Sequence, residues 1–127
     1  MVWITALIFF GYGVLFTLSP NTLFERVTDS ALFSYSASID VRATYGGMSV
    51  AVCIILILLV IKNETLKVSV VASTLLAGFM ALARTVGIAI ESQPNDTMLL
   101  YLLAEAFFTL WGVFILWKLP KRRFYFK

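Results

Sequence analysis

Seven ionisable or phenolic side chains lie inside long apolar stretches of the sequence or at their ends: Asp40, Arg42, Tyr45, Arg84, Glu91, Tyr101 and Glu105. Arginine binds carboxylates and phosphates through paired N–H donors, and a carboxylate in apolar surroundings is a candidate general acid or base. Charged groups within a membrane span are costly and are functional candidates. The set therefore predicts a binding site for a polar group, or acid–base chemistry, in an apolar protein.

Helical spacing gathers these side chains on shared faces. Three groups follow that spacing: Arg42, Tyr45 and Ser49 at i, i+3 and i+7, Arg84 and Glu91 at i and i+7, and Tyr101 and Glu105 at i and i+4. All three faces belong to the same half of the predicted bundle. We predict one pocket there, with these ligand-binding residues: Asp40, Arg42, Tyr45, Arg84, Tyr101 and Glu105. The alternative is a structural polar network that only fixes helix packing.

Arg84 and Glu105 are expected to form an ion pair. Arg84 lies six residues before Ile90 and Glu105 eight residues after Thr97, which places them about 9 Å and 12 Å from the same membrane surface. The two stretches are joined by a short turn, so they must run antiparallel. Because an unpaired arginine at this depth needs water or a partner, we expect Glu105 to pair with it.

The composition excludes whole classes of function. Of the 127 residues, 61% are hydrophobic and 13% are charged, whereas soluble domains carry about 25% charged residues. The chain has no histidine and a single cysteine, Cys53. This excludes histidine-ligated haem or zinc, a Ser-His-Asp triad and an internal disulfide. We expect a membrane protein with no metal or other cofactor, in which Cys53 is a packing residue.

Four apolar stretches are long enough to cross a bilayer as helices, since a hydrocarbon core of about 30 Å needs roughly 20 residues. They cover residues 2–18, 44–61, 66–90 and 97–119. Their apolar character runs all round, without the alternation of a membrane strand. Ser19-Pro20 ends the first stretch, because proline cannot continue a helix. The predicted fold is an all-α membrane protein, a single domain forming a four-transmembrane-helix bundle.

The basic residues indicate the orientation of the spans. Seven lie near the second turn or the C-terminus: Lys62, Lys67, Lys118, Lys121, Arg122, Arg123 and Lys127. Only Arg26 and Arg42 lie outside the spans on the other side. The positive-inside rule therefore places both termini in the cytoplasm. We interpret the basic C-terminus as a topology signal that contacts anionic lipids, and not as a nucleic-acid site, because no nucleic-acid-binding motif accompanies it.

The connection between the first two spans, on the predicted outer side, has an amphipathic pattern. Thr22–Glu25 fits a capping box, which would begin a short helix. Leu23, Phe24, Val27 and Ala31 would then face the membrane, and the polar side chains would face water. The pattern predicts a short amphipathic segment that lies on the surface as a lid, and the alternative is a poorly ordered loop.

Small residues recur at helical spacing on two of the spans. They are Gly47 and Ala51 on the second span, and Ser69, Ser73, Ala77 and Ala81 on the third. Such stripes allow helix backbones to approach closely. We favour packing within one bundle, and a contact between copies in a homo-oligomer is the alternative.

Three parts of the sequence carry a resemblance to a known family: Asp40–Gly47 (DVRATYGG), Arg84–Ile88 (RTVGI) and Glu105. They resemble a family of small bacterial four-span membrane proteins that is catalogued as a domain of unknown function, and the resemblance covers nearly the whole chain. It implies a location in the bacterial cytoplasmic (inner) membrane, but no activity. In size and span number the chain is also similar, more distantly, to DoxX-like four-helix membrane proteins.

These observations favour a protein that binds an amphiphile, such as a lipid, a fatty acid or a quinone-like molecule. The arginines would contact its polar head, the carboxylates would orient the arginines, and Tyr45 and Tyr101 would lie at the boundary of head and chain. The second hypothesis is a membrane-embedded isomerase or proton-transfer enzyme that uses Glu105 or Glu91. The third is a structural or accessory subunit of a membrane complex. Membrane lipids are the expected partners in each case.

Overall fold

The computed structural model describes residues 1–91 and 94–119, with only the backbone at residue 91. Its elements are, in order, α1 (Val2–Leu18), α2 (Pro20–Thr28), α3 (Tyr35–Val41), the π-helix η1 (Arg42–Gly47), α4 (Met48–Ile61), α5 (Leu66–Glu91) and α6 (Asp96–Lys118). Every regular element in this part of the chain is a helix. The predicted all-α fold class is therefore confirmed.

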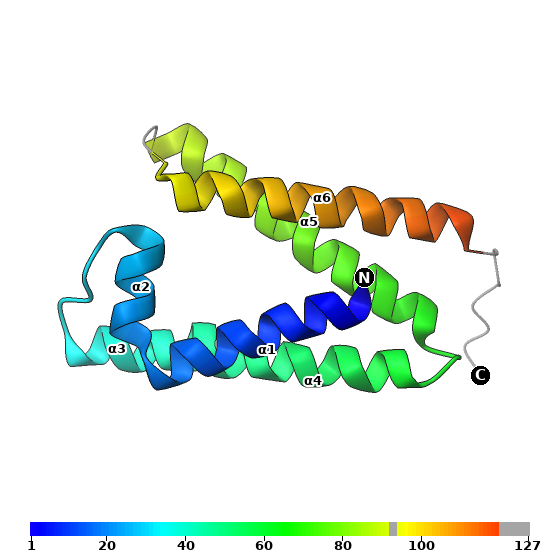
Figure 1. The fold of residues 1–127 in the computed structure, drawn as a ribbon, viewed down its shortest axis with the longest axis horizontal. Coiled ribbons are helices and arrows are strands. Elements are labelled where there is room, and N and C mark those ends of the chain that lie inside the picture. The colour runs from blue at the N-terminus through cyan, green and yellow to red at the C-terminus, as the bar shows by residue number, and fades with distance from the viewer. Residues whose placement is uncertain (92–93, 120–127) are drawn as a thin grey trace.

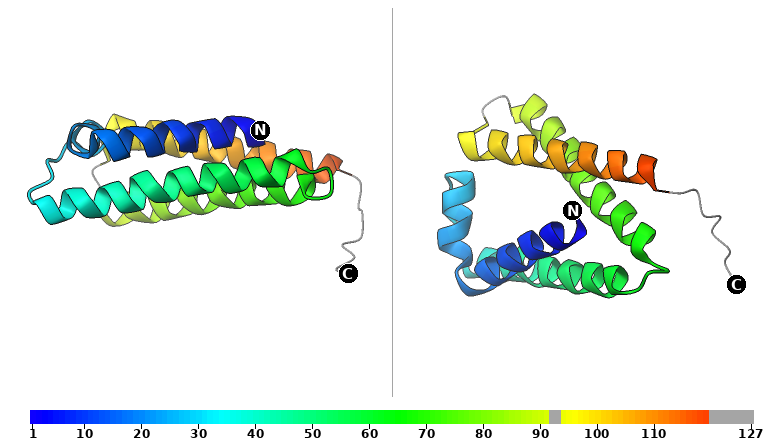
Figure 2. Two further views of the ribbon diagram at one scale, coloured as in Figure 1. Left: turned by 90° about the horizontal axis from the view of Figure 1, so that it is seen from below. Right: turned by 45° about the vertical axis from the view of Figure 1, so that its right-hand side comes forward.

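The helices form two antiparallel hairpins (Figure 1). α1 packs along η1 and α4, and α5 packs along α6. α5 crosses the molecule obliquely, from the end of α4 to the start of α6. α2 stands across one end of the bundle, between the end of α1 and the start of α6 (Figure 2). We call this end the α2 end.

Three helical segments are long and apolar enough to cross a membrane: Tyr35–Ile61, Leu66–Ile90 and Asp96–Lys118. α1 alone has 17 residues, or about 26 Å at 1.5 Å per residue, slightly less than a core of about 30 Å. Together with α2 it forms a fourth candidate span, bent by 118°. The described part of the chain thus has three helical segments able to span a membrane, or four if the bent pair α1–α2 is one span, as the predicted four-helix bundle requires.

The second span extends further than its apolar stretch. Its helix begins at Tyr35 instead of Thr44, after Ser34, whose Oγ accepts a hydrogen bond from a first-turn N–H at 3.1 Å. Such a cap satisfies an amide that has no partner inside the helix. The predicted start at Thr44 is wrong because hydropathy does not detect the polar first turns. Asp40 and Arg42 consequently lie on the helix and not in a connection.

Ser19-Pro20 separates α1 from α2, as predicted. Ser19 leaves the helical region with φ −135° and ψ 62°. Pro20 then occupies the first position of α2, where its fixed φ is suitable and its missing N–H costs nothing. The predicted capping box at Thr22–Glu25 is wrong, because the helix has already begun at Pro20 and its N-cap residue makes no side-chain hydrogen bond.

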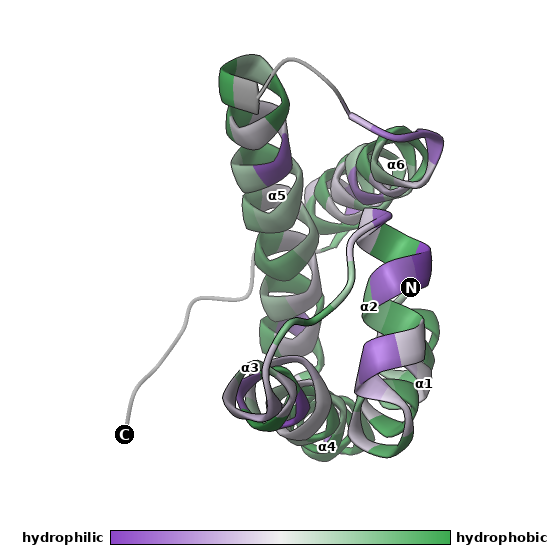
Figure 3. Cartoon of the chain, turned by 90° about the vertical axis from the view of Figure 1, so that its left-hand side faces the viewer, coloured by the Kyte–Doolittle hydropathy of each residue, from purple (hydrophilic) through white to green (hydrophobic). Residues whose placement is uncertain are grey.

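α2 is the predicted short amphipathic segment, seen from the side in Figure 3, where the α2 end faces the viewer. Its apolar side is turned partly toward the protein and not only toward the membrane. Val27 is 7% exposed, and Leu23 and Phe24 are half-buried. Ala31, which was expected on the same face, lies beyond the helix and is exposed. α2 contacts α6, and the backbone oxygen of Val27 accepts a hydrogen bond from Asn95 just before α6, which turns this side of α2 toward the protein.

α1 and η1 approach closely at Gly46. A Cβ atom at this position would lie 2.5 Å from Oγ1 of Thr17 and 3.1 Å from its backbone N, so only glycine fits here without movement. The predicted contact residues, Gly47 and Ala51, are exposed instead. A π-helix has more residues per turn than an α-helix, so α-helical spacing predicts the wrong face across η1.

A buried core lies toward the end opposite α2. Cys53 packs there in an apolar cluster with Leu56 and Val70. Ser69 and Ser73, which belong to the predicted small-residue stripe of α5, are fully buried. Small and apolar side chains therefore hold this half of the bundle together, whereas Asp40, Arg42, Arg84 and Glu105 lie in the half near α2.

Candidate functional site

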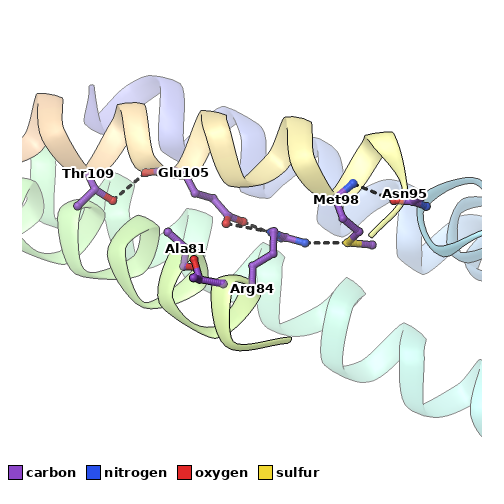
Figure 4. A network of polar contacts seen from close by, with 7 residues as sticks. Ala81, Arg84, Asn95, Met98, Glu105 and Thr109 are labelled. Atoms are coloured by element: carbon purple, nitrogen blue, oxygen red, sulfur yellow. Dashed lines mark hydrogen bonds and ion pairs between the residues drawn. The ribbon is translucent and has the colours of Figure 1, made fainter. Parts of the chain in front are cut away.

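Arg84 on α5 and Glu105 on α6 form the predicted ion pair (Figure 4). Nε of Arg84 donates to Oε2 of Glu105 at 3.0 Å, and Nη2 donates to Oε1 at 2.6 Å. Two parallel hydrogen bonds fix the relative orientation of both groups as well as their distance. The side chains are 19% and 10% exposed. The pair is therefore a largely buried unit with a defined geometry.

The packing of α5 on α6 determines which residues of the two helices lie opposite each other, and so brings Arg84 next to Glu105. Oγ1 of Thr109 donates to the backbone oxygen of Glu105 at 2.7 Å. Gly78 on α5 faces Thr109, since a Cβ atom on Gly78 would lie 3.5 Å from Cγ2 of Thr109. Small residues at a helix interface permit close approach. This approach aligns the two helices so that Arg84 and Glu105 meet.

The third guanidinium nitrogen of Arg84 has a weaker partner. Nη1 donates to the sulfur of Met98 at 3.0 Å (Figure 4). A thioether is a weak acceptor, so an oxygen atom from a ligand can replace it. The guanidinium also lies over the ring of Tyr101, with its central carbon 5.3 Å from the ring centroid. Arg84 is thus held on two sides and presents one N–H group for binding.

A cavity of about 430 Å³ opens beside Arg84 at the α2 end. It is lined by side chains of α2, α5 and the start of α6: Thr28, Asp29, Arg84, Gly87, Ile88, Pro94, Asn95 and Met98. The lining combines one cation, one carboxylate, an amide and a hydroxyl with apolar walls. This combination is typical of small-molecule sites, in which a few polar groups orient a ligand in an apolar pocket.

Asn95 joins α2 to α6 at the edge of this cavity. Its Oδ1 accepts a hydrogen bond from the N–H of Met98 at 2.9 Å and so caps α6. Its Nδ2 donates to the carbonyl of Val27 at 3.0 Å and to Oδ2 of Asp29 at 2.6 Å. The sequence analysis did not identify Asn95 or Asp29 as site residues. An asparagine before an apolar run predicts a helix start, but the contact with α2 has no local signal.

We expect Asn95→Asp to release α2 and to preserve the start of α6. Aspartate keeps the acceptor for the N–H of Met98, but it loses both Nδ2 hydrogen bonds and adds a carboxylate beside Asp29. At about 0.5–1.5 kcal/mol per bond, amide hydrogen exchange in α2 should accelerate by roughly tenfold. Asn95→Ala should accelerate exchange in the first turn of α6 as well. Unchanged exchange in α2 of Asn95→Asp would contradict this role.

Arg42 and Asp40 lie on the other hairpin and do not line the cavity. Nη1 of Arg42 donates to the backbone oxygen of Thr17, and cations favour the carbonyls at a helix C-terminus. Asp40 is exposed, and its backbone oxygen accepts a hydrogen bond from Thr44 at 2.7 Å. These contacts show Arg42 stabilising the end of α1. The continuous helix from Tyr35 explains why the two residues lie apart from the cavity.

A row of aromatic rings connects the two hairpins. Tyr45 contacts Phe16 at 5.3 Å between ring centroids, Phe16 contacts Tyr12 at 4.9 Å, and Tyr12 meets Tyr101 edge to face at 6.2 Å. Tyr101 in turn contacts Arg84. Such pairs contribute about 0.5–1.5 kcal/mol each beyond the area that they bury. The sequence analysis missed Tyr12 and Phe16, although their i, i+4 spacing on α1 is a signal of contact.

The structure thus brings together Arg84, Tyr101 and Glu105, and Tyr45 joins them through the aromatic row. The side chain of Glu91, and the basic residues predicted at 121–127, lie outside the described residues. Among the side chains that the structure describes, no group of three or more Asp, Glu, Cys or His residues is arranged to hold a metal ion.

Together, the fold and this site define a small helical membrane protein with several spans and a buried ion pair between two of them. Residues 1–116 match the family DUF4345, which is described as a domain of unknown function. The chain belongs to this family, and the resemblance noted from its motifs is confirmed. No curated protein and no solved structure matches the chain.

Proposed function

We propose that this protein binds a membrane amphiphile, with its polar head in the cavity at the α2 end and its chain along α5. The observation that carries the proposal is the arrangement around Arg84. Two of its guanidinium nitrogens are bonded to Glu105, and the third has only the sulfur of Met98 on the cavity wall. A preorganised donor with a weak partner loses little when an oxygen of a ligand takes that place.

An apolar groove supports the second half of the proposal. It lies between α4 and α5, has a volume of about 670 Å³, and is lined only by apolar side chains. On α5 it extends from Ala72 to Ala83, about 16 Å at 1.5 Å per residue. This is about half of a 30 Å hydrocarbon core, the depth that one lipid chain spans. Ala83 lies one turn from Gly87, which lines the head cavity.

The orientation of the protein in the membrane is part of the proposal. Lys62, Lys67 and Lys118 lie at the end opposite α2, where α4, α5 and α6 have their other termini. By the positive-inside rule this end faces the cytoplasm, as do both termini. The resemblance to a family of bacterial membrane proteins supports the inner membrane as the location, and in this orientation the cavity beside Arg84 receives its ligand from the outer leaflet.

No feature of the site gives comparable support to the alternative that Glu105 acts as a general acid or base. Both carboxylate oxygens of Glu105 already accept hydrogen bonds from Arg84. A general acid or base needs hydrogen-bond reach to the proton that it transfers, and Glu105 does not line the cavity beside Arg84. We therefore assign Glu105 the task of orienting Arg84. The next experiment tests whether the pair of Arg84 and Glu105 takes part in ligand binding or has only a structural role.

The double variant Arg84→Gln/Glu105→Gln is expected to bind lipid at least about tenfold more weakly than the wild type, because a hydrogen bond from a charged donor contributes roughly 1.5–3 kcal/mol. Two amide side chains can still bond to each other, so the packing between α5 and α6 is retained. The measurement is native mass spectrometry of the full chain in detergent, titrated with a palmitoyl phosphatidylethanolamine. Arg26→Gln, which removes a charge from the exposed side of α2, is the matched control. Equal binding by the double variant and the wild type would leave the pair with a structural role only.

A further inference from the structure

We infer that the head group bound at this site is zwitterionic, with a phosphate at Arg84 and a primary ammonium at Asp29. The inference rests on the proposed function and specifies its ligand class, a glycerophospholipid with a primary amine. Arg84 and Asp29 both line the cavity, from different helices.

The charge balance disfavours a head that carries negative charge alone. The positive charge of Arg84 is already matched by the carboxylate of Glu105. Asp29 adds a carboxylate to the cavity lining. An anionic head at Arg84 would therefore meet two carboxylates and one guanidinium. A head that also carries a cation gives Asp29 a partner, and the charges of ligand and site then balance more closely.

The two groups lie at different depths in the membrane. Arg84 is seven residues from the end of α5, or about 10 Å along the helix axis, and is largely buried. Asp29 follows the last residue of α2 at the α2 end and is exposed. In a phospholipid the phosphate lies next to the apolar chains and the amine lies further out. Arg84 and Asp29 have the same order, with the cationic group nearer the apolar groove.

Asp29 is held in place for such a contact. Its backbone is left-handed, with φ 55° and ψ 26°, a conformation that aspartate tolerates better than most residues. Asn95 donates to its Oδ2, which leaves the second carboxylate oxygen to accept. Thr28 donates to the carbonyl of Phe24 at 2.8 Å, so its hydroxyl oxygen can also accept. A primary ammonium has three N–H donors and can therefore donate to the second carboxylate oxygen of Asp29 and to the hydroxyl oxygen of Thr28.

The residues of the cavity wall favour the binding of a primary ammonium over a quaternary one. A quaternary ammonium has no N–H donor and is recognised mainly by the faces of aromatic rings. The cavity lining that the structure describes contains no aromatic side chain. Carboxylate, hydroxyl and amide oxygens instead suit a group that donates hydrogen bonds. The site is therefore expected to prefer an ethanolamine head to a choline head with the same chains.

Native mass spectrometry of the full chain tests this preference with three lipids that share identical palmitoyl chains: phosphatidylethanolamine, phosphatidylcholine and phosphatidylglycerol. We expect the wild type to bind the first about tenfold more tightly than the other two. Asp29→Asn keeps an acceptor for Asn95 but removes the charge, and should reduce this preference to about twofold or less. Glu25→Gln, one turn earlier on the exposed side of α2, should leave it unchanged.

The outcomes separate this inference from the proposed function. Equal binding of the three lipids by the wild type, combined with loss of binding in Arg84→Gln/Glu105→Gln, overturns the zwitterionic head and leaves amphiphile binding in place. A preference that persists in Asp29→Asn overturns the assignment of the ammonium to Asp29. Binding that no variant changes overturns both proposals. Loss of the preference in Asp29→Asn, and not in Glu25→Gln, supports the inference.

Discussion

Glu105→Ala is expected to lower the free energy of unfolding by about 3–5 kcal/mol, because it leaves the guanidinium of Arg84 without its charged partner in largely apolar surroundings. Arg84 would lose two hydrogen bonds, from Nε and Nη2. Its side chain is only 19% exposed, and the aromatic ring of Tyr101 alone does not replace a carboxylate. Equilibrium unfolding in mixed micelles, followed by helical circular dichroism, measures this loss.

The control is Arg84→Met/Glu105→Leu, which replaces both partners by apolar side chains of similar size. Replacing a buried ion pair in this way is often neutral or stabilising, because the desolvation cost of the two charges disappears. We expect this variant to be within about 1 kcal/mol of the wild type or more stable, and to bind lipid poorly. A loss in the double variant as large as in Glu105→Ala would show that packing, and not the unpaired charge, explains the destabilisation.

The ion pair could be predicted from the sequence because few variables determine it. Helical rise and the lengths of two adjacent apolar stretches fix the depth of Arg84 and Glu105, and a short turn makes the helices antiparallel. The lipid environment then removes most alternatives, since every backbone polar group must be satisfied within a helix. The same argument predicts α5 and α6 to within one residue of their observed ends.

The cavity could not be predicted in this way. Its walls depend on α2 folding back after Pro20 by 118° and meeting Asn95 across the bundle. This contact joins residues 68 positions apart in the chain, and neither sequence segment carries a local signal for the other. Hydropathy also placed Asp40 and Arg42 in a connection, because it reports the apolar part of a helix and not its polar first turns. Three residues of the predicted pocket, Asp40, Arg42 and Tyr45, therefore belong to the other hairpin.

The two hairpins are joined near the site by contacts of different kinds. α2 bonds to α6 through Asn95, and the aromatic row links Tyr45 to Tyr101 through α1. A change in the packing of α1 on α4 therefore moves Tyr12 relative to Arg84. The close approach of α1 to the second span is for this reason important for the site as well as for stability.

Gly13→Ala tests that close approach, and it is expected to destabilise the protein by about 1–3 kcal/mol through overpacking. A Cβ atom on Gly13 would lie 2.7 Å from Cγ2 of Val50 and 2.9 Å from the backbone oxygen of Gly46. Val50 could adjust its side chain, but the carbonyl of Gly46 belongs to a helix backbone and moves only with η1. The same unfolding measurement in mixed micelles determines the change.

Gly11→Ala, two residues earlier on the same helix, is the matched control. Nothing lies within 4 Å of a Cβ atom at Gly11, so the higher helix propensity of alanine should stabilise the protein by about 0.5–1 kcal/mol. The two substitutions are chemically identical and lie in one helix, and only their contacts with the second span differ. Effects of opposite sign would therefore measure the helix contact itself. Equal effects would mean that α1 does not pack on η1 and α4 as described, and the aromatic row that connects α1 to Arg84 would lose its support.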